Sequence, residues 1–243
     1  MKSDIKIFST PEELARSFAS WLMDFIAETG TRQSSVTIAL PGGNTPRLFF
    51  SILAEKYSAT QEWGNVHIFW GDERCVPPDD PESNYGEAYE LFLKKINLPA
   101  AGIHRIMGEE DPDNEALRYS DEIKNNTRSR NALPALDLII LGLGNDGHTA
   151  SIFPGKMALL DSEKICGVAV HPDTGQKRIT LTGRVINNAD NIVFLVTGEN
   201  KARVIQDVLI PTKASVRYPA SYIAPKYGKL FWFLDKGAAR LIL

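Results

Sequence analysis

Residues 136–155 read LDLIILGLGNDGHTASIFPG, and this stretch decides the fold. Residues 138–141 are an unbroken apolar run, which is typical of a strand covered on both faces in a parallel sheet. A turn with three glycines follows, and glycine permits positive φ angles and close approach of another molecule. Ligands of open α/β sheets bind beyond the carboxyl ends of the strands, so we expect Asp146 and His148 to lie at such a crevice. The alternative is a tight connection with a solvated histidine.

The 243 residues are enough for one α/β domain with a large core, and no Pro/Gly/Ser-rich linker divides them, so we predict a single domain, 1–243. A net charge of −3 gives no general attraction to nucleic acid or to an anionic membrane. Cys75 and Cys166 are far apart and lack the spacing of metal ligands. No secretory signal and no run of 18 apolar residues is present, so we expect a soluble, cytoplasmic protein.

Short apolar runs alternate with helical patterns along the chain. The patterns predict strands near 5–8, 36–40, 66–70, 138–141, 164–170, 177–182, 191–197 and 230–234, with helices near 11–26, 46–53, 84–92, 114–126 and 202–209. This alternation predicts a Rossmann-like α/β fold, a mostly parallel sheet with helices on both faces.

The second strand ends in PGGNTP at 41–46, directly before an apolar helix. Free backbone N–H groups and the helix dipole both favour an anion here, so Gly42, Gly43, Asn44 and Thr45 are candidates for a phosphate cradle. The sequence is neither a Walker motif nor G-x-G-x-x-G, which disfavours a nucleotide. The alternative is a structural turn in which Asn44 or Thr45 caps the helix.

The third strand releases two acids and an arginine, Asp72, Glu73 and Arg74, into a loop stiffened by prolines. Charges in such a place need partners or a ligand, and for Glu73 we expect an internal ion pair. Ser83 or Asn84 is interpreted as a helix cap. His67 and His104 stand alone and are interpreted as structural.

Five motifs, taken together and in order, resemble the 6-phosphogluconolactonases of the pentose phosphate pathway over nearly the whole chain. They are LPGGNTPRLFF (40–50), WGDERCVPPDDPESNYG (70–86), LGLGNDGHTASIFPG (141–155), RITLT (178–182) and TGENKA (197–202). One departure is Asn44, where the family often has serine; both side chains can donate a hydrogen bond. The resemblance implies hydrolysis of 6-phospho-D-glucono-1,5-lactone to 6-phospho-D-gluconate.

A second resemblance is to glucosamine-6-phosphate deaminases, which share the Gly-Gly loop and the Asp-Gly-His turn. Those enzymes usually continue toward Phe-Asn-Glu-Pro, whereas TASIFP follows His148 here and no glutamate occurs before Glu163. Ring opening, isomerisation and ammonia release need several acid and base groups, so the missing glutamate favours hydrolysis.

The implied chemistry assigns His148 as the general base, because an imidazole titrates near neutrality. Asp146 would orient that imidazole, Arg74 would stabilise the oxyanion, and Asp72 would position Arg74 or a sugar hydroxyl. Arg178 and Lys201 join the Gly-Gly loop as phosphate ligands by the resemblance alone.

An ester is already electrophilic, so no metal or other cofactor is expected. The expected partner is a small phosphosugar lactone, and the expected state is a monomer or small homo-oligomer. One alternative is covalent catalysis by Ser151 or Cys75. Another is a non-catalytic sugar-phosphate sensor, which would not need Asp146 and His148 together.

Overall fold

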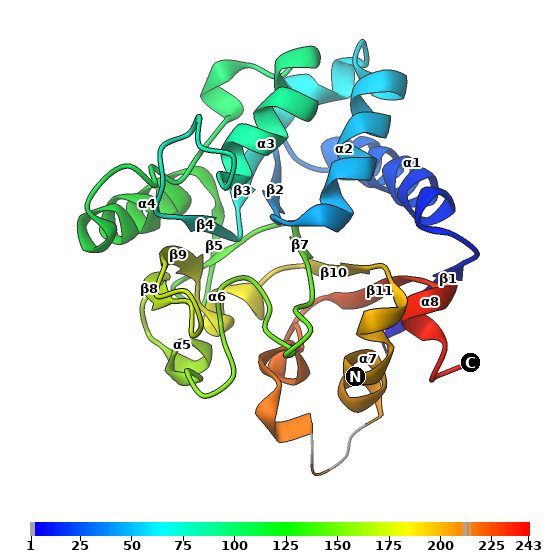
Figure 1. Cartoon of the computed structure of the whole chain (residues 1–243). Helices are drawn as coiled ribbons and strands as arrows, with labels where there is room; N and C mark the ends of the chain where they lie inside the picture. The colour runs from blue at the N-terminus through cyan, green and yellow to red at the C-terminus, as the bar shows by residue number, and fades with distance from the viewer. Residues whose placement is uncertain (1–2, 211–212, 214) are drawn as a thin grey trace.

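The computed structural model describes residues 3–210, 213 and 215–243, and its centre is a parallel sheet (Figure 1). Six strands pair in the order β1-β11-β10-β7-β2-β3, and every pairing between them is parallel. Their bounds are β1 Asp4–Phe8, β2 Val36–Leu40, β3 Val66–Trp70, β7 Leu138–Leu141, β10 Asn191–Val196 and β11 Lys229–Asp235. The prediction of a mostly parallel α/β sheet is confirmed.

Helices cover both faces of this sheet, as Figure 1 shows, with α1, α2 and α3 on one side and α6 and α7 on the other. Their bounds are α1 Pro11–Gly30, α2 Asn44–Tyr57, α3 Asn84–Leu91, α4 Pro112–Asn126, α5 Ala158–Asp161, α6 Gly183–Ile186, α7 Ala202–Leu209 and α8 Lys236–Ala239. Short 3₁₀ helices are η1 Gln61–Asn65, η2 Leu93–Lys95, η3 Ala100–Gly102, η4 Glu199–Lys201, η5 Ser215–Arg217 and η6 Pro219–Tyr222. None of the described helices has both the length and the apolarity that crossing a bilayer requires.

Helix α1 illustrates how the sequence sets these elements. The Thr10 hydroxyl accepts a hydrogen bond from the Glu13 N–H at 3.2 Å, and Pro11 occupies the first turn, where its missing N–H costs nothing. Phe18 and Leu22 lie on the apolar stripe that packs on the sheet, and both are buried. The helix is therefore held by its cap and by one buried face.

A second, antiparallel sheet corrects the expectation for the segment after β3. Residues 72–74 are not a loop: they form β4 (Asp72–Arg74), which pairs with β9 (Lys177–Leu181), and β9 pairs with β8 (Cys166–Val170). A short charged strand has little strand propensity of its own, and its partner lies about a hundred residues later, so the sequence pattern gives no local signal. Another short hairpin joins β5 (Arg128–Arg130) to β6 (Leu133–Ala135).

The edge strand β3 is partly covered by the chain that precedes α4. Ile68 and Ile103 form an isolated bridge, and the His104 N–H donates to the Ile68 carbonyl at 2.8 Å. The His104 ring lies between partners, with His67 Nδ1 2.8 Å from its Nε2 and Glu122 Oε1 2.6 Å from its Nδ1. Both histidines thus belong to the packing of this edge, away from the cleft described below.

The switch point of the sheet lies between β2 and β7. After β2 the chain adds β3 on one side, and later strands continue from β7 on the other side. Connections therefore leave β2 and β7 in opposite directions, which opens a crevice at their carboxyl ends.

Candidate active site

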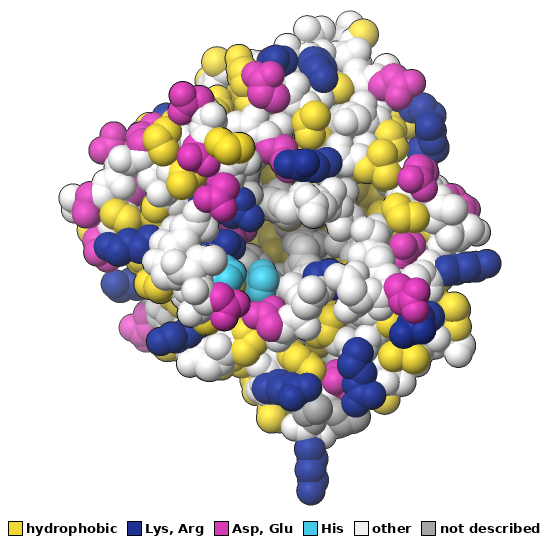
Figure 2. Space-filling model, viewed as in Figure 1, with side chains coloured by type: hydrophobic (Ala, Val, Ile, Leu, Met, Phe, Trp, Pro, Cys, Tyr) yellow, Lys and Arg dark blue, Asp and Glu magenta, His cyan; other side chains and the backbone are white. Residues whose placement is uncertain are grey.

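A cleft of about 520 Å³ occupies this crevice. Figure 2 shows a hollow near the middle of this face, with histidine and basic side chains at its rim. The cleft is lined by residues from five separate parts of the chain: 41–46, 71–84, 140–150, Arg178 and 195–201. Nine of the ten sequence-predicted site residues line the cleft: Gly42, Gly43, Asn44, Thr45, Asp72, Arg74, His148, Arg178 and Lys201.

 The tenth, Asp146, is not in the lining but is hydrogen-bonded to His148, as described below.

The Gly-Gly loop forms one wall of the cleft. Gly43 has φ of +99°, a conformation that a side chain would strain, and it is the N-cap of α2, with no side-chain cap hydrogen bond. The interpretation of Asn44 or Thr45 as the cap is therefore wrong. Thr45 Oγ1 instead lies 3.1 Å from Thr197 Oγ1 at the end of β10. The first N–H groups of α2 are left without a capping side chain, which suits an anion.

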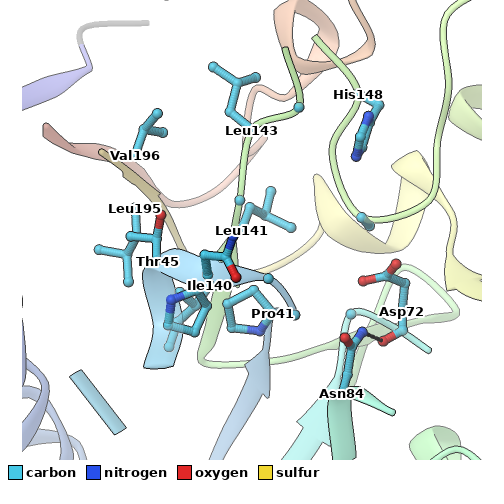
Figure 3. Close-up of a pocket in the computed structure, with 18 of the residues that line it drawn as sticks. Pro41, Thr45, Asp72, Asn84, Ile140, Leu141, Leu143, His148, Leu195 and Val196 are labelled. Atoms are coloured by element: carbon cyan, nitrogen blue, oxygen red, sulfur yellow. Dashed lines mark hydrogen bonds between the residues drawn. The ribbon is translucent and has the colours of Figure 1, made fainter. Parts of the chain in front are cut away.

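Asn84 is a residue of the cleft that the sequence analysis interpreted only as a cap. Its side chain is buried, and its Nδ2 donates to the Asp72 carbonyl at 2.9 Å (Figure 3). A Cβ on Gly42 would lie 1.9 Å from Asn84 Oδ1, so the glycine is what allows the two segments to touch. Ser83 is the cap, and it accepts from the Gly86 N–H at 3.0 Å. The contact between Asn84 and Gly42 joins two segments that are far apart in the sequence, so no local sequence pattern predicts it.

Asp146 and His148 form a hydrogen-bonded pair. Asp146 Oδ1 lies 2.6 Å from His148 Nδ1 and also accepts the His148 backbone N–H at 3.2 Å. Partial burial acts to raise the pKa of Asp146, but the hydrogen bond and the charge of His148 outweigh it and leave that pKa lowered. A bond to Nδ1 leaves Nε2 as the second ring nitrogen, available for proton transfer.

The register of β4 and β9 brings three charged side chains to one face of the small sheet. Asp72 and Arg74 are two residues apart, and Arg74 is the direct partner of Arg178 across the strands. All three line the cleft. Like charges directly opposite one another destabilise a strand pair, so an anion bound between or beside the two arginines would stabilise this pairing.

The two guanidinium groups also carry unused donors. Among the described residues, Arg74 Nε and Arg178 Nε are buried without a hydrogen-bond partner. Burial, followed by the charge of Arg74, lowers the pKa of Arg178, against the opposing charge of Asp72. A bound anion would satisfy both donors and offset both unfavourable effects.

Glu73 points away from this charged face, and the expected ion pair is wrong. Its carboxylate accepts from the backbone N–H groups of Arg74, Asn84 and Tyr85 at 2.7–2.8 Å and from the Ser83 hydroxyl at 3.1 Å. Burial raises its pKa, and the three backbone hydrogen bonds oppose that effect. Glu73 therefore fastens β4 to the start of α3.

The two nucleophiles considered for covalent catalysis are placed unfavourably. Ser151 is fully buried, and its Oγ donates to Asp72 Oδ2 at 2.5 Å. Burial raises the pKa of the Cys75 thiol to about 11, which keeps it protonated near neutrality. Neither side chain lines the cleft.

Lys201 enters the cleft from η4, immediately before α7. Burial lowers its pKa, and the charge of Asp146 opposes this effect. Nearby, Asn200 Nδ2 donates to Asn145 Oδ1 at 3.0 Å, which ties this segment to the turn after β7. Within the described residues, no group of three or more His, Cys, Asp or Glu side chains is arranged to hold a metal ion.

Comparison with known proteins places this geometry in a family. Residues 9–232 match the family described as glucosamine-6-phosphate isomerases/6-phosphogluconolactonase. A 6-phosphogluconolactonase of Haemophilus influenzae is 44% identical over 210 residues, which cover 85% of this chain and 88% of that protein. The chain belongs to this family.

Two solved structures extend the likeness to the fold. A crystal structure of a protein named devB is 41% identical with a TM-score of 0.93, and the match covers 100% of both chains. The 6-phosphogluconolactonase of Trypanosoma brucei is 28% identical with a TM-score of 0.88, covering 100% of this chain and 99% of that one. The glucosamine-6-phosphate isomerase/6-phosphogluconolactonase family thus accounts for the whole α/β architecture.

The family name covers two chemistries, and the acid groups at the cleft bear on which one this chain performs. Among the described residues, Asp72 is the one carboxylate in the lining. Glu163, the next glutamate after His148, has a side chain that is 95% exposed and lies 3.7 Å from Arg184. It therefore supplies no further acid or base to the cleft.

Proposed function

We propose that this chain hydrolyses 6-phospho-D-glucono-1,5-lactone to 6-phospho-D-gluconate, the lactonase step of the oxidative pentose phosphate pathway. The observation that carries the proposal is the Asp146–His148 pair at a cleft that also contains Arg74, Arg178 and Lys201. The relatives named 6-phosphogluconolactonase support the same reaction. We further propose a cytoplasmic enzyme of one domain, active as a monomer or small homo-oligomer.

In the proposed mechanism His148 is the general base. Its Nδ1–H donates to Asp146, so Nε2 takes the proton from the attacking water. Water adds to the lactone carbonyl, and the carbonyl oxygen becomes an oxyanion. The protonated imidazole then gives its proton to the departing ring oxygen, and the ester bond breaks. Asp146 stabilises the charged imidazolium between these two steps.

Arg74 is the proposed partner of the oxyanion, and its unpartnered Nε is a donor that the reaction can use. Asp72, fixed by Ser151, would hold a sugar hydroxyl or the Arg74 guanidinium. Water is the proposed nucleophile for two reasons. The Ser151 hydroxyl already donates a hydrogen bond to Asp72, and the Cys75 thiol is protonated near neutrality.

The proposed phosphate site combines Arg178 and Lys201 with the loop of Gly42, Gly43, Asn44 and Thr45. Arginine offers a planar pair of donors to phosphate, and lysine offers a point charge. The uncapped start of α2 adds backbone N–H groups. Binding energy gained at the phosphate would hold the distant carbonyl against the catalytic water.

The test follows acid release from freshly made 6-phosphogluconolactone, with spontaneous hydrolysis subtracted, beside an ammonia assay on glucosamine 6-phosphate. We expect fast lactone loss and no ammonia. His148→Ala should lower kcat by about 10²- to 10⁴-fold while 6-phosphogluconate still binds, because general acid–base catalysis contributes about that factor. His67→Ala, which lies outside the cleft, is the matched control.

Each other outcome contradicts a defined part of the proposal. Near-normal turnover by His148→Ala would remove the general-base assignment. Ammonia release would favour the deaminase reaction, and silence in both assays with product binding retained would favour a sugar-phosphate sensor.

A further inference from the structure

The turn that carries Asp146 and His148 packs against a segment about seventy residues later in the chain. Gly147, between the two, has φ of +83°, and a Cβ there would lie 2.2 Å from Cδ1 of the Tyr218 ring. The Ala220 N–H donates to the Gly147 carbonyl at 3.1 Å. The ring and this hydrogen bond together hold the middle of the turn from outside.

Tyr218 is itself firmly held. Its side chain is buried, and its hydroxyl donates to Asp207 Oδ2 at 3.1 Å while Arg217 donates to that hydroxyl at 2.5 Å. Asp207 belongs to α7, the helix that begins directly after Lys201. The Tyr218 side chain is therefore anchored to α7, and the other end of this helix follows Lys201 at the cleft.

The other hydrogen bonds of the turn lie away from the Gly147 Cα. The Gly147 N–H donates to the Gly144 carbonyl at 3.1 Å, the Gly144 N–H donates to the His148 carbonyl at 2.9 Å, and Asn145 Oδ1 accepts from Asn200 at 3.0 Å. Asp146 is exposed to solvent. Three glycines in six residues give its backbone wide conformational freedom. The Tyr218 ring fills the space into which the backbone of Gly147 would otherwise move.

We propose that Tyr218 is a positioning residue that fixes the Asp146–His148 pair through its contact with Gly147. This inference rests on the proposed lactonase function. A displacement of about 1 Å in a catalytic group can cost about a hundredfold in rate, whereas binding of a phosphate held by other segments depends on the turn far less. Tyr218 thus acts on kcat rather than on affinity.

The experiment compares Tyr218→Ala with Tyr218→Phe, which keeps the ring and loses only the hydroxyl. We expect Tyr218→Ala to lower kcat at least about tenfold, with KM and the Kd of 6-phosphogluconate within about threefold of wild type. Tyr218→Phe should keep kcat within about threefold, because the ring makes the contact. Tyr222→Ala, an exposed aromatic of the same segment, is the matched control and should leave kcat unchanged.

A second readout does not depend on turnover: the NMR signal of the His148 Nδ1 proton, which is bonded to Asp146. It should be shifted or lost in Tyr218→Ala and kept in Tyr218→Phe and Tyr222→Ala. If Tyr218→Ala does not fold, Tyr218→Leu, which keeps an apolar side chain, replaces it with the same expectations.

Unchanged kcat and an unchanged Nδ1 signal in the folded variant would overturn the proposal. Equal losses of kcat and of product affinity would also overturn it, since they would indicate a general structural role. If wild type itself does not hydrolyse the lactone, the proposed function fails, and the Nδ1 signal still decides whether Tyr218 positions the pair.

Discussion

Gly144 shows how closely single residues are fitted around the candidate base. A Cβ at this position would lie 2.2 Å from His148 Nδ1 and 2.5 Å from Asp146 Oδ1. The contacts are shorter than any van der Waals separation, so even a methyl group must displace the pair. The glycine is thus required for space, since Gly144 is not one of the glycines with a positive φ angle.

We therefore expect Gly144→Ala to lower kcat at least about tenfold, because the imidazole loses its position. KM should change much less, since the proposed phosphate ligands lie on other segments. Steady-state kinetics of lactone hydrolysis, with thermal unfolding to verify folding, measures both effects.

Gly30→Ala is the control, because a Cβ at Gly30 meets no atom within 4 Å. That variant should keep full activity. Normal kcat in a folded Gly144→Ala enzyme would show that the pair tolerates the displacement and would contradict the expectation.

Lys201 predicts a pH dependence of ligand affinity. Burial lowers its pKa below the ordinary value of 10.5, so the free enzyme loses this positive charge at a lower pH than an ordinary lysine does. A phosphate binds the protonated form better, so affinity is fully present below the lowered pKa and is lost as pH rises through it. Calorimetry with 6-phosphogluconate from about pH 7 to about pH 10 measures this loss.

Lys201→Arg keeps its charge over that whole range and is the natural comparison. Its affinity should vary less with pH than that of the wild type. Identical pH profiles for the two proteins would rule out Lys201 as the titrating phosphate ligand.

At the scale of elements, the antiparallel pairing of β4 and β9 places two arginines with different proposed roles beside each other. Arg74 and Arg178 are direct partners, yet one is assigned to the oxyanion and the other to the phosphate. Arg74→Lys should mainly lower kcat, and Arg178→Lys should mainly raise KM, each about tenfold, because lysine lacks the planar fork.

Steady-state kinetics of the two variants measures kcat and KM separately, and each variant is the control for the other. Both variants keep the positive charge, so a difference between them reports geometry. If both raise only KM, Arg74 belongs to the phosphate site as well.

The sequence predicted the strands of the central sheet because most of them are short buried apolar runs, as in β7 (Leu138–Leu141). It did not predict β4, which consists of three charged residues. The pairing of β4 depends on β9, a strand about a hundred positions later. The same distance hid the role of Asn84, whose place beside Gly42 follows from the packing of α3 against the loop before α2. Arg178 and Lys201 came from the family resemblance, since no local pattern brings them together.

At the scale of the whole molecule, the cleft joins segments from residue 41 to residue 201, so a bound ligand should stabilise the entire fold. A ligand at about 100 times its Kd adds about 2.7 kcal/mol to the free energy of unfolding. For a chain of this size that is about 5 to 11 °C in Tm. Thermal unfolding with and without 6-phosphogluconate checks this value.

Gluconate, which lacks the phosphate, is the matched control ligand and should raise Tm much less at the same concentration. Arg178→Lys should reduce the effect of 6-phosphogluconate. Equal shifts with the two ligands would mean that the phosphate contributes little to binding.

The order of strands in the central sheet has a consequence for synthesis on the ribosome. β1 pairs with β11 alone in this sheet, and β11 is the last strand of the described chain. Residues 4–8 therefore leave the ribosome more than two hundred residues before their partner exists, and they wait unpaired until residues 229–235 follow. A nascent chain stopped before Lys229 would lack β11, and β1 would then have no neighbouring strand to pair with, so the sheet would be two strands short.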